Sequence, residues 1–169
     1  HVFKKIRSER DSESEILENQ KDYASNNVFG MDFDPIIAKV AKAYMLIWGD
    51  GRSNICIGDG LNDANWSDDT RAKFQVKDDN GKRVFRKFDI IATNPPFAGD
   101  ISADDTLQKY ELAYKNTNGK NKKINKVSRD ILFVERCINS LSPKGRMAIV
   151  LPRGILKNYN DERVRRFIL

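Results

Sequence analysis

Apolar residues recur at every third or fourth position in several segments of the chain, which predicts helices with one apolar face. The clearest segment is 36–48, where Asp34 is placed to cap the helix start and Pro35 fits the first helical position. A second helix of this kind is expected over 128–142, and a shorter, basic one over 161–169.

Short apolar runs rich in branched side chains lie between the helical segments and predict strands. These runs lie at 28–34, 53–61, 88–92 and 145–151, and the sequence Asp-Asn-Gly-Lys at 79–82 predicts a hairpin turn. Because strands and helices alternate along the chain, the expected fold class is α/β with a buried parallel sheet.

Two segments lack these patterns and are polar. Residues 1–27 are expected to be the end of a helix followed by a surface linker, which leaves 28–169 as one domain. Within this domain, residues 98–127 form a long segment rich in Lys, Asn and Gly, which we expect to be a flexible loop.

The positive charge of the chain is concentrated in and just after that loop. The formal net charge is +6, and residues 115–129 include six Lys or Arg residues and no acid. A basic loop can contact the phosphates of a nucleic acid, so we assign this role to four residues: Lys120, Lys122, Lys123 and Lys126. The alternative is a solvated loop without a partner, because runs of like charge are often only solvated.

The residue types present argue against several other kinds of chemistry. The one histidine is His1, so a His-based acid–base mechanism has no candidate, and no cluster of metal ligands is visible. Cys56 and Cys137 lie in apolar patterns and are expected to be buried thiols. No apolar run reaches the length of a membrane span, and we expect a cytoplasmic protein without a membrane partner.

The apolar run at 88–92 leads into the turn Asn94-Pro95-Pro96-Phe97, which carries the most specific chemistry of the chain. The prolines stop the strand and stiffen its carboxyl end, where α/β sheets bind their ligands. The Asn94 side-chain oxygen and the Pro95 carbonyl can accept hydrogen bonds from the two N–H groups of an amine. Phe97 offers a face for a flat ring. This set suits the exocyclic amine of a nucleobase, although the same residues could form only a rigid turn with a core Phe.

Asn94-Pro95-Pro96-Phe97 after an apolar strand resembles the catalytic motif of amino-directed methyltransferases that use S-adenosylmethionine. Over most of residues 28–156, the chain resembles the modification subunit of type I restriction–modification systems and related enzymes that methylate adenine N6 in DNA. The resemblance implies a Rossmann-like sheet with helices on both faces, S-adenosylmethionine as cofactor, and these four residues as the catalytic set. It also implies DNA, a specificity subunit and a restriction subunit as partners.

The same resemblance places the cofactor at two acidic turns. Asp32 would accept hydrogen bonds from both ribose hydroxyls, although the family usually has Glu there, and Phe33 would pack against the adenine ring. Asp59 would accept from the adenine amine, with the Gly60 backbone as a second contact and Gly58 in the same turn.

Two parts of the family's sheet have no counterpart in this sequence: the first strand with its Gly-rich loop, and the last strands. We therefore expect an incomplete domain that exposes apolar sheet edges, can dimerise through them, and by itself binds S-adenosylmethionine weakly with little activity. The alternatives are methylation of cytosine N4, of RNA or of a protein amide, and a non-catalytic nucleic-acid-binding or assembly module.

Overall fold

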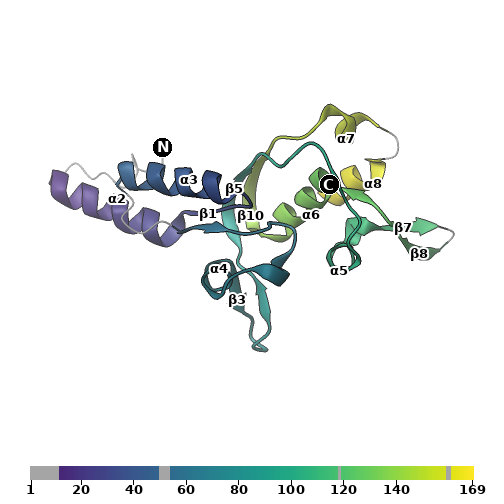
Figure 1. The fold of residues 1–169 in the computed structure, drawn as a ribbon, viewed down its shortest axis with the longest axis horizontal. Coiled ribbons are helices and arrows are strands. Elements are labelled where there is room, and N and C mark those ends of the chain that lie inside the picture. The colour runs from purple at the N-terminus through teal and green to yellow at the C-terminus, as the bar shows by residue number, and fades with distance from the viewer. Residues whose placement is uncertain (1–11, 50–53, 118, 159–160) are drawn as a thin grey trace. The chain divides into compact units, whose positions relative to one another are not determined.

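The structure is a computed structural model, and it describes residues 12–49, 54–117, 119–158 and 161–169. The helix end expected near the start of the chain falls mostly outside these ranges. The fold is mixed α/β, as predicted, and the chain divides into two compact units, His1–Phe74 and Gln75–Leu169 (Figure 1).

The first unit is built on one parallel strand pair. β1 (Phe29–Asp32) pairs with β2 (Asn54–Ile57), and the register ends at Asp32↔Ile57, so the carboxyl ends of both strands lie side by side. α3 (Pro35–Ile47) connects the strands and packs against both. The unit also contains α2 (Glu13–Asn27), η1 (Asp63–Asn65) and α4 (Asp68–Phe74).

A helix, α2, occupies the segment in which a surface linker was expected. It begins with a capping box, in which the Ser12 side chain accepts from the Glu15 N–H and the Glu15 carboxylate accepts from the Ser12 N–H at 2.8 Å. Ala24 is the buried residue of the helix. Because the other described side chains of α2 lie on or near the surface, the spacing of apolar residues did not reveal it. The domain boundary expected after residue 27 stays a prediction.

The start of α3 is as predicted, whereas its apolar face is not buried. Asp34 Oδ1 accepts from the Ile36 N–H at 2.7 Å, and Pro35 occupies the first helical position. Ala38 is buried, but Ile47 and Trp48 are 78% and 81% exposed. The apolar face of α3 is therefore largely exposed.

The second unit is also built on one parallel pair, formed by β5 (Phe88–Thr93) and β10 (Leu141–Ile149). α6 (Arg129–Asn139) precedes β10, close to the predicted helix, and it supplies much of the core of this unit. The buried apolar residues of α6 are Ile131, Leu132, Val134 and Cys137. Two short helices follow β10, namely α7 (Arg153–Lys157) and α8 (Glu162–Ile168).

The predicted hairpin at 79–82 is confirmed. β3 (Gln75–Lys77) and β4 (Arg83–Phe85) are antiparallel, and the turn between them contains Gly81 with φ +75°. This left-handed backbone conformation favours glycine, which is why an Asn-Gly pair is a reliable local signal for a hairpin.

Residues 98–127 contain regular structure in place of the expected flexible loop. β6 (Asp100–Ile101) pairs with β9 (Val127–Ser128) and closes the segment at its base. Between them lie two short helices and a hairpin: α5 (Asp104–Leu107), η2 (Glu111–Ala113), β7 (Tyr114–Thr117) and β8 (Lys120–Lys123). The hairpin strands carry Lys and Asn where a strand pattern would show alternating apolar residues, so the sequence did not reveal them.

The parallel strands are less buried than predicted. No residue of β5 is fully buried, and Ile90 is 69% exposed. Among the described residues, each strand pairs with one other strand only. The edge of β5 that faces away from β10 is therefore unpaired within these residues. In the described ranges no helix combines the length and apolar character needed to cross a membrane.

Candidate functional site

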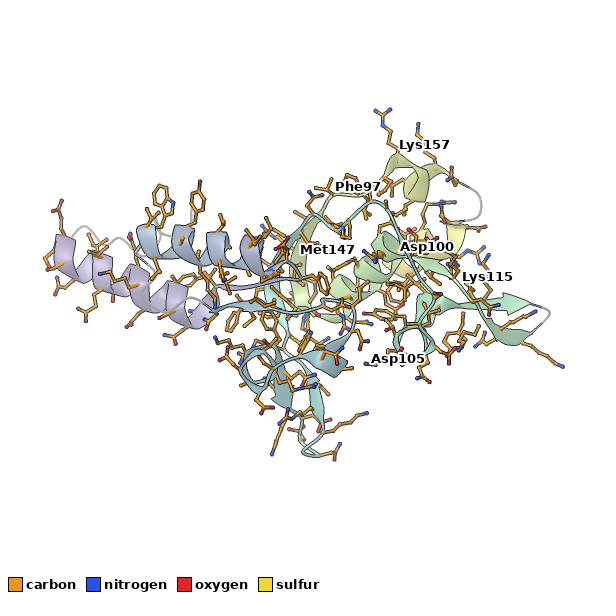
Figure 2. All side chains as sticks on the ribbon, in the orientation of Figure 1. Phe97, Asp100, Asp105, Lys115, Met147 and Lys157 are labelled. Carbon is orange, nitrogen blue, oxygen red and sulfur yellow. The ribbon has the colours of Figure 1, made fainter. Side chains whose placement is uncertain are left out.

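The turn Asn94-Pro95-Pro96-Phe97 follows directly on β5, as predicted, at the carboxyl end of the strand pair. The Val150 N–H donates to the Thr93 carbonyl at 3.1 Å just before the turn. Pro95 is buried, whereas Asn94, Pro96 and Phe97 are exposed, Phe97 by 55%. The buried proline anchors the turn and leaves the Asn94 amide and the Phe97 ring, which is labelled in Figure 2, accessible to a ligand.

The side-chain amide of Asn94 is available for hydrogen bonding. Its side chain makes no hydrogen bond to the residues that the structure describes, so its oxygen is available as an acceptor. An amide acceptor near an exposed aromatic ring matches a ligand that carries an amino group on a flat ring. The geometry is therefore compatible with the predicted role of this turn.

A cation outside the predicted site lies close to the same turn. Gly99 has φ +94°, and a Cβ at this position would lie 3.4 Å from Cζ of the Arg129 guanidinium. The Arg129 N–H also donates to the Gly99 carbonyl at 3.1 Å. The pairing of β6 with β9 brings these two residues together from 30 positions apart, and no local sequence signal could have shown it.

The residues predicted to hold the cofactor all lie in the first unit and gather at the carboxyl ends of β1 and β2. Asp32 ends β1, and its carbonyl accepts from the Gly58 N–H at 3.0 Å, which joins the two predicted turns. Asp59 and Gly60 continue the turn after β2. Phe33 is 76% exposed and can meet a flat ring.

Gly58 has little space for a side chain. A Cβ there would lie 3.2 Å from both the Met31 sulfur and the Trp66 Nε1. Trp66 is fixed in place because its Nε1–H donates to the Asp59 carbonyl at 2.8 Å. The turn after β2 is therefore packed tightly from behind, which defines the position of Asp59.

Each acidic residue of this pair of turns uses one carboxylate oxygen to shape its own turn. Asp32 Oδ1 accepts from the Asp34 N–H at 2.8 Å, and Asp59 Oδ1 accepts from the Leu61 N–H at 2.8 Å. The second oxygen of each carboxylate makes no hydrogen bond to a described residue. Two free acceptors and one open aromatic face fit a ligand with hydroxyl and amine donors, which is the donor set of the nucleoside part of S-adenosylmethionine.

Both cysteines are buried free thiols, as predicted. Burial raises the pKa of the Cys56 thiol, and it raises that of Cys137 to about 11. Because the thiolate is the reactive form, a raised pKa makes both residues poor nucleophiles near neutral pH.

The four lysines predicted to contact phosphates fall into two groups. Lys123 forms an ion pair with Asp104, and Lys126 forms one with Asp100 at 2.9 Å. Lys120 and Lys122 are exposed and have no ion pair with any described residue. The structure thus separates two lysines bound to this unit from two that are available to a partner.

A buried acid supports the segment that leads into the β7–β8 hairpin. Glu135 is only 2% exposed, and its two carboxylate oxygens accept from the N–H groups of Glu111 and Leu112, each at 2.7 Å. Arg163 donates to the Leu112 carbonyl from α8. Burial raises the pKa of Glu135 in spite of its two hydrogen bonds, and burial lowers the pKa of Arg163.

Comparisons with known proteins agree with this chemistry. A family model described as N-6 DNA Methylase matches residues 11–169. Among solved structures, the chain is similar to a modification subunit assigned to a type I restriction enzyme from Vibrio vulnificus YJ016, with a TM-score of 0.59 and 17% identity. The similarity covers 95% of this chain and 29% of that one, and at this identity it shows a shared fold. Comparison with curated proteins gives no match.

Proposed function

Because the chain belongs to the N-6 DNA Methylase family, we propose that it forms part of an enzyme that methylates adenine N6 in DNA within a restriction–modification system. The observation that carries this proposal is the exposed pair Asn94 and Phe97 on a turn anchored by buried Pro95 at the carboxyl end of β5. An adenine base inside a duplex cannot reach such a turn, so the target base must be flipped out of the helix.

The turn would hold the target base by its amine and its ring. Asn94 Oδ1 and the Pro95 carbonyl would accept hydrogen bonds from the two N6–H groups, and Phe97 would stack on the purine. Both acceptors draw the amine toward a pyramidal geometry, which frees its lone pair from conjugation with the ring. Pro96 stiffens the turn, so catalysis comes from orientation and electrostatics without a covalent enzyme intermediate.

S-adenosylmethionine supplies the methyl group when it is bound. The free carboxylate oxygen of Asp32 would accept from its ribose hydroxyls, and that of Asp59 from its adenine amine. Phe33 would cover the adenine ring, while Gly58 and Gly60 keep the backbone of the second turn close to the ligand.

The wider architecture and partners are also part of the proposal. We propose a Rossmann-like sheet with helices on both faces, to which the parallel pairs β1–β2 and β5–β10 each contribute strands. The partners would be DNA, a specificity subunit and a restriction subunit in the cytoplasm, and the enzyme could form a dimer.

The direct test uses the complete natural protein with its Asn94→Ala variant. Each is incubated with plasmid DNA and methyl-labelled S-adenosylmethionine, and the DNA is digested to nucleosides. We expect label in N6-methyladenine with the natural protein and a loss of at least about a hundredfold in the variant, as for removal of a transition-state contact.

Asn80→Ala is a matched control, because Asn80 is an exposed asparagine in a hairpin turn of the same unit. It should methylate DNA at the natural rate. Label in N4-methylcytosine would keep the mechanism but change the substrate. Full adenine methylation by the Asn94→Ala variant would overturn the role given to this turn.

A further inference from the structure

We propose that one face of the β7–β8 hairpin, defined by Lys115, Lys120 and Lys122 and called here the lysine face, binds the phosphate backbone of duplex DNA. This inference rests on the proposed function and deepens it. It replaces the predicted set of four lysines with a different set of three, chosen by geometry.

The strand register places these three lysines on the same side of the hairpin. Lys115 lies directly opposite Lys122, and Tyr114 lies opposite Lys123. Because successive side chains of a strand point to opposite faces, Lys120 shares the face of Lys122, and Lys123 points the other way with Tyr114. Residues 120 and 122 are about 7 Å apart along the strand, twice the roughly 3.4 Å rise per phosphate of one DNA strand.

The lysine face carries an electrostatic cost that an anion would remove. Like charges directly opposite each other destabilise a strand pair, and Lys115 and Lys122 form such a pair. Neither of them, nor Lys120, has an ion pair with a described residue. The β3–β4 hairpin also pairs two cations, Lys77 and Arg83, but Asp78 and Asp79 follow directly in its turn. In the β7–β8 hairpin no acid compensates the charge.

The opposite face of the hairpin is fixed to the rest of the unit. Lys123 is ion-paired with Asp104 of α5, and the Ile124 N–H donates to the Ala113 carbonyl at 2.8 Å at the base of the hairpin. Glu135 and Arg163 hold the residues just before β7. Because the base is held in place, little backbone conformational entropy is lost when the free face meets a ligand.

A nucleic acid fits the lysine face better than a protein does. Lysine is depleted at protein–protein interfaces, whose centres need apolar and aromatic side chains. The strand positions on this side of the hairpin hold three lysines and Thr117, with no aromatic or large apolar residue. Lysine contacts to phosphates position a protein on DNA without reading its sequence. Lys115 and Phe97 lie well apart in Figure 2, so the hairpin would contact DNA beside the target base.

The test measures how DNA binding by the complete natural protein depends on salt. A fluorescent 30-base-pair duplex is titrated between 50 and 300 mM KCl, with the natural protein and with the triple variant Lys115→Ala, Lys120→Ala and Lys122→Ala. Three lost phosphate contacts should reduce the slope of log K against log salt by about 2.7, and affinity at 0.1 M salt on the order of a hundredfold. S-adenosylmethionine binding should not change.

The matched control removes the same charge from the other hairpin, by Lys77→Ala, Lys82→Ala and Arg83→Ala. All three residues are exposed, and this control should change the salt slope by less than 1. An unchanged slope in the lysine-face variant, or equal losses in both triple variants, would overturn the inference. Natural protein that binds DNA through this face but methylates no base would contradict the proposed function and leave the inference standing.

Discussion

At the level of single residues, Glu135 shows how a buried acid can order a segment next to the proposed lysine face. Its carboxylate accepts two backbone N–H groups of η2, just before the β7–β8 hairpin. An aliphatic side chain at this position would leave both donors without this acceptor, at a cost of about 1–3 kcal/mol for the buried Leu112 N–H.

This environment predicts an unusual pH dependence of stability. Since the pKa of Glu135 is raised from its ordinary value of 4.5 by burial, the folded state holds this proton more tightly than the unfolded state. The free energy of unfolding that Glu135 contributes is therefore full below pH 4.5 and falls as the pH rises through the folded-state pKa. Glu135→Gln cannot lose a proton and should lack this fall.

Urea unfolding of both proteins between about pH 4 and pH 7 measures the effect. The stability of the natural protein relative to the Glu135→Gln variant should decrease with rising pH. A difference that stays constant over this range would show that Glu135 has an ordinary pKa. Asp79→Asn, at an exposed acid in the β3–β4 turn of the same unit, is the control and should leave the pH profile unchanged.

Single residues also show where sequence reasoning succeeds and where it stops. The roles of Asp34 as a cap and of Pro95 and Pro96 as a strand stop follow from local chemistry, so they could be predicted. The position of Arg129 beside Gly99 depends on a pairing between distant segments, for which the sequence has no local signal.

At the level of elements, the β1–α3 junction contains two acids, one that caps a helix and one that we propose to bind the cofactor. Asp34 caps α3, whereas Asp32 shapes the turn and keeps one oxygen free. Asp34→Ala should lower the free energy of unfolding by about 1 kcal/mol through loss of the cap, and Asp34→Ser should restore most of it. S-adenosylmethionine binding should be unchanged, because the Asp34 N–H that bonds Asp32 belongs to the backbone.

Urea unfolding and calorimetric titration of the complete protein test this pair of expectations. Loss of cofactor binding in a stably folded Asp34→Ala variant would contradict the division of roles. It would instead place Asp34 among the residues that hold the ligand.

The elements that the sequence missed have a common physical cause. α2 buries little apolar surface, and β7 and β8 consist mostly of Lys and Asn, so none of these elements has the apolar periodicity on which the predictions relied. The sequence marks these elements in other ways. Ser12 and Glu15 form the capping box of α2, and a glycine, Gly119, stands between the hairpin strands, where the backbone takes φ +77°. Conversely, the apolar pattern of α3 predicted the helix correctly but not the exposure of its apolar face.

At the level of the whole molecule, the proposed roles divide along the two compact units. The acids and glycines assigned to the cofactor belong to His1–Phe74, whereas the Asn94 turn and the lysine face belong to Gln75–Leu169. This division predicts that a substitution can weaken the binding of one ligand without changing the binding of the other. Asp32→Asn keeps an oxygen for the Asp34 N–H but removes the charged acceptor, a loss of about 1.5–3 kcal/mol.

S-adenosylmethionine should therefore bind the Asp32→Asn variant of the complete protein about 10- to 100-fold more weakly by calorimetry, with an unchanged salt slope for DNA. The lysine-face variant should show the reverse pattern. Since the two sets of residues belong to separate compact units, we expect the double variant to lose the sum of the two free energies. Loss of DNA affinity in Asp32→Asn alone would instead mean that the cofactor residues and the DNA-binding surface are coupled, so that neither unit acts on its ligand independently.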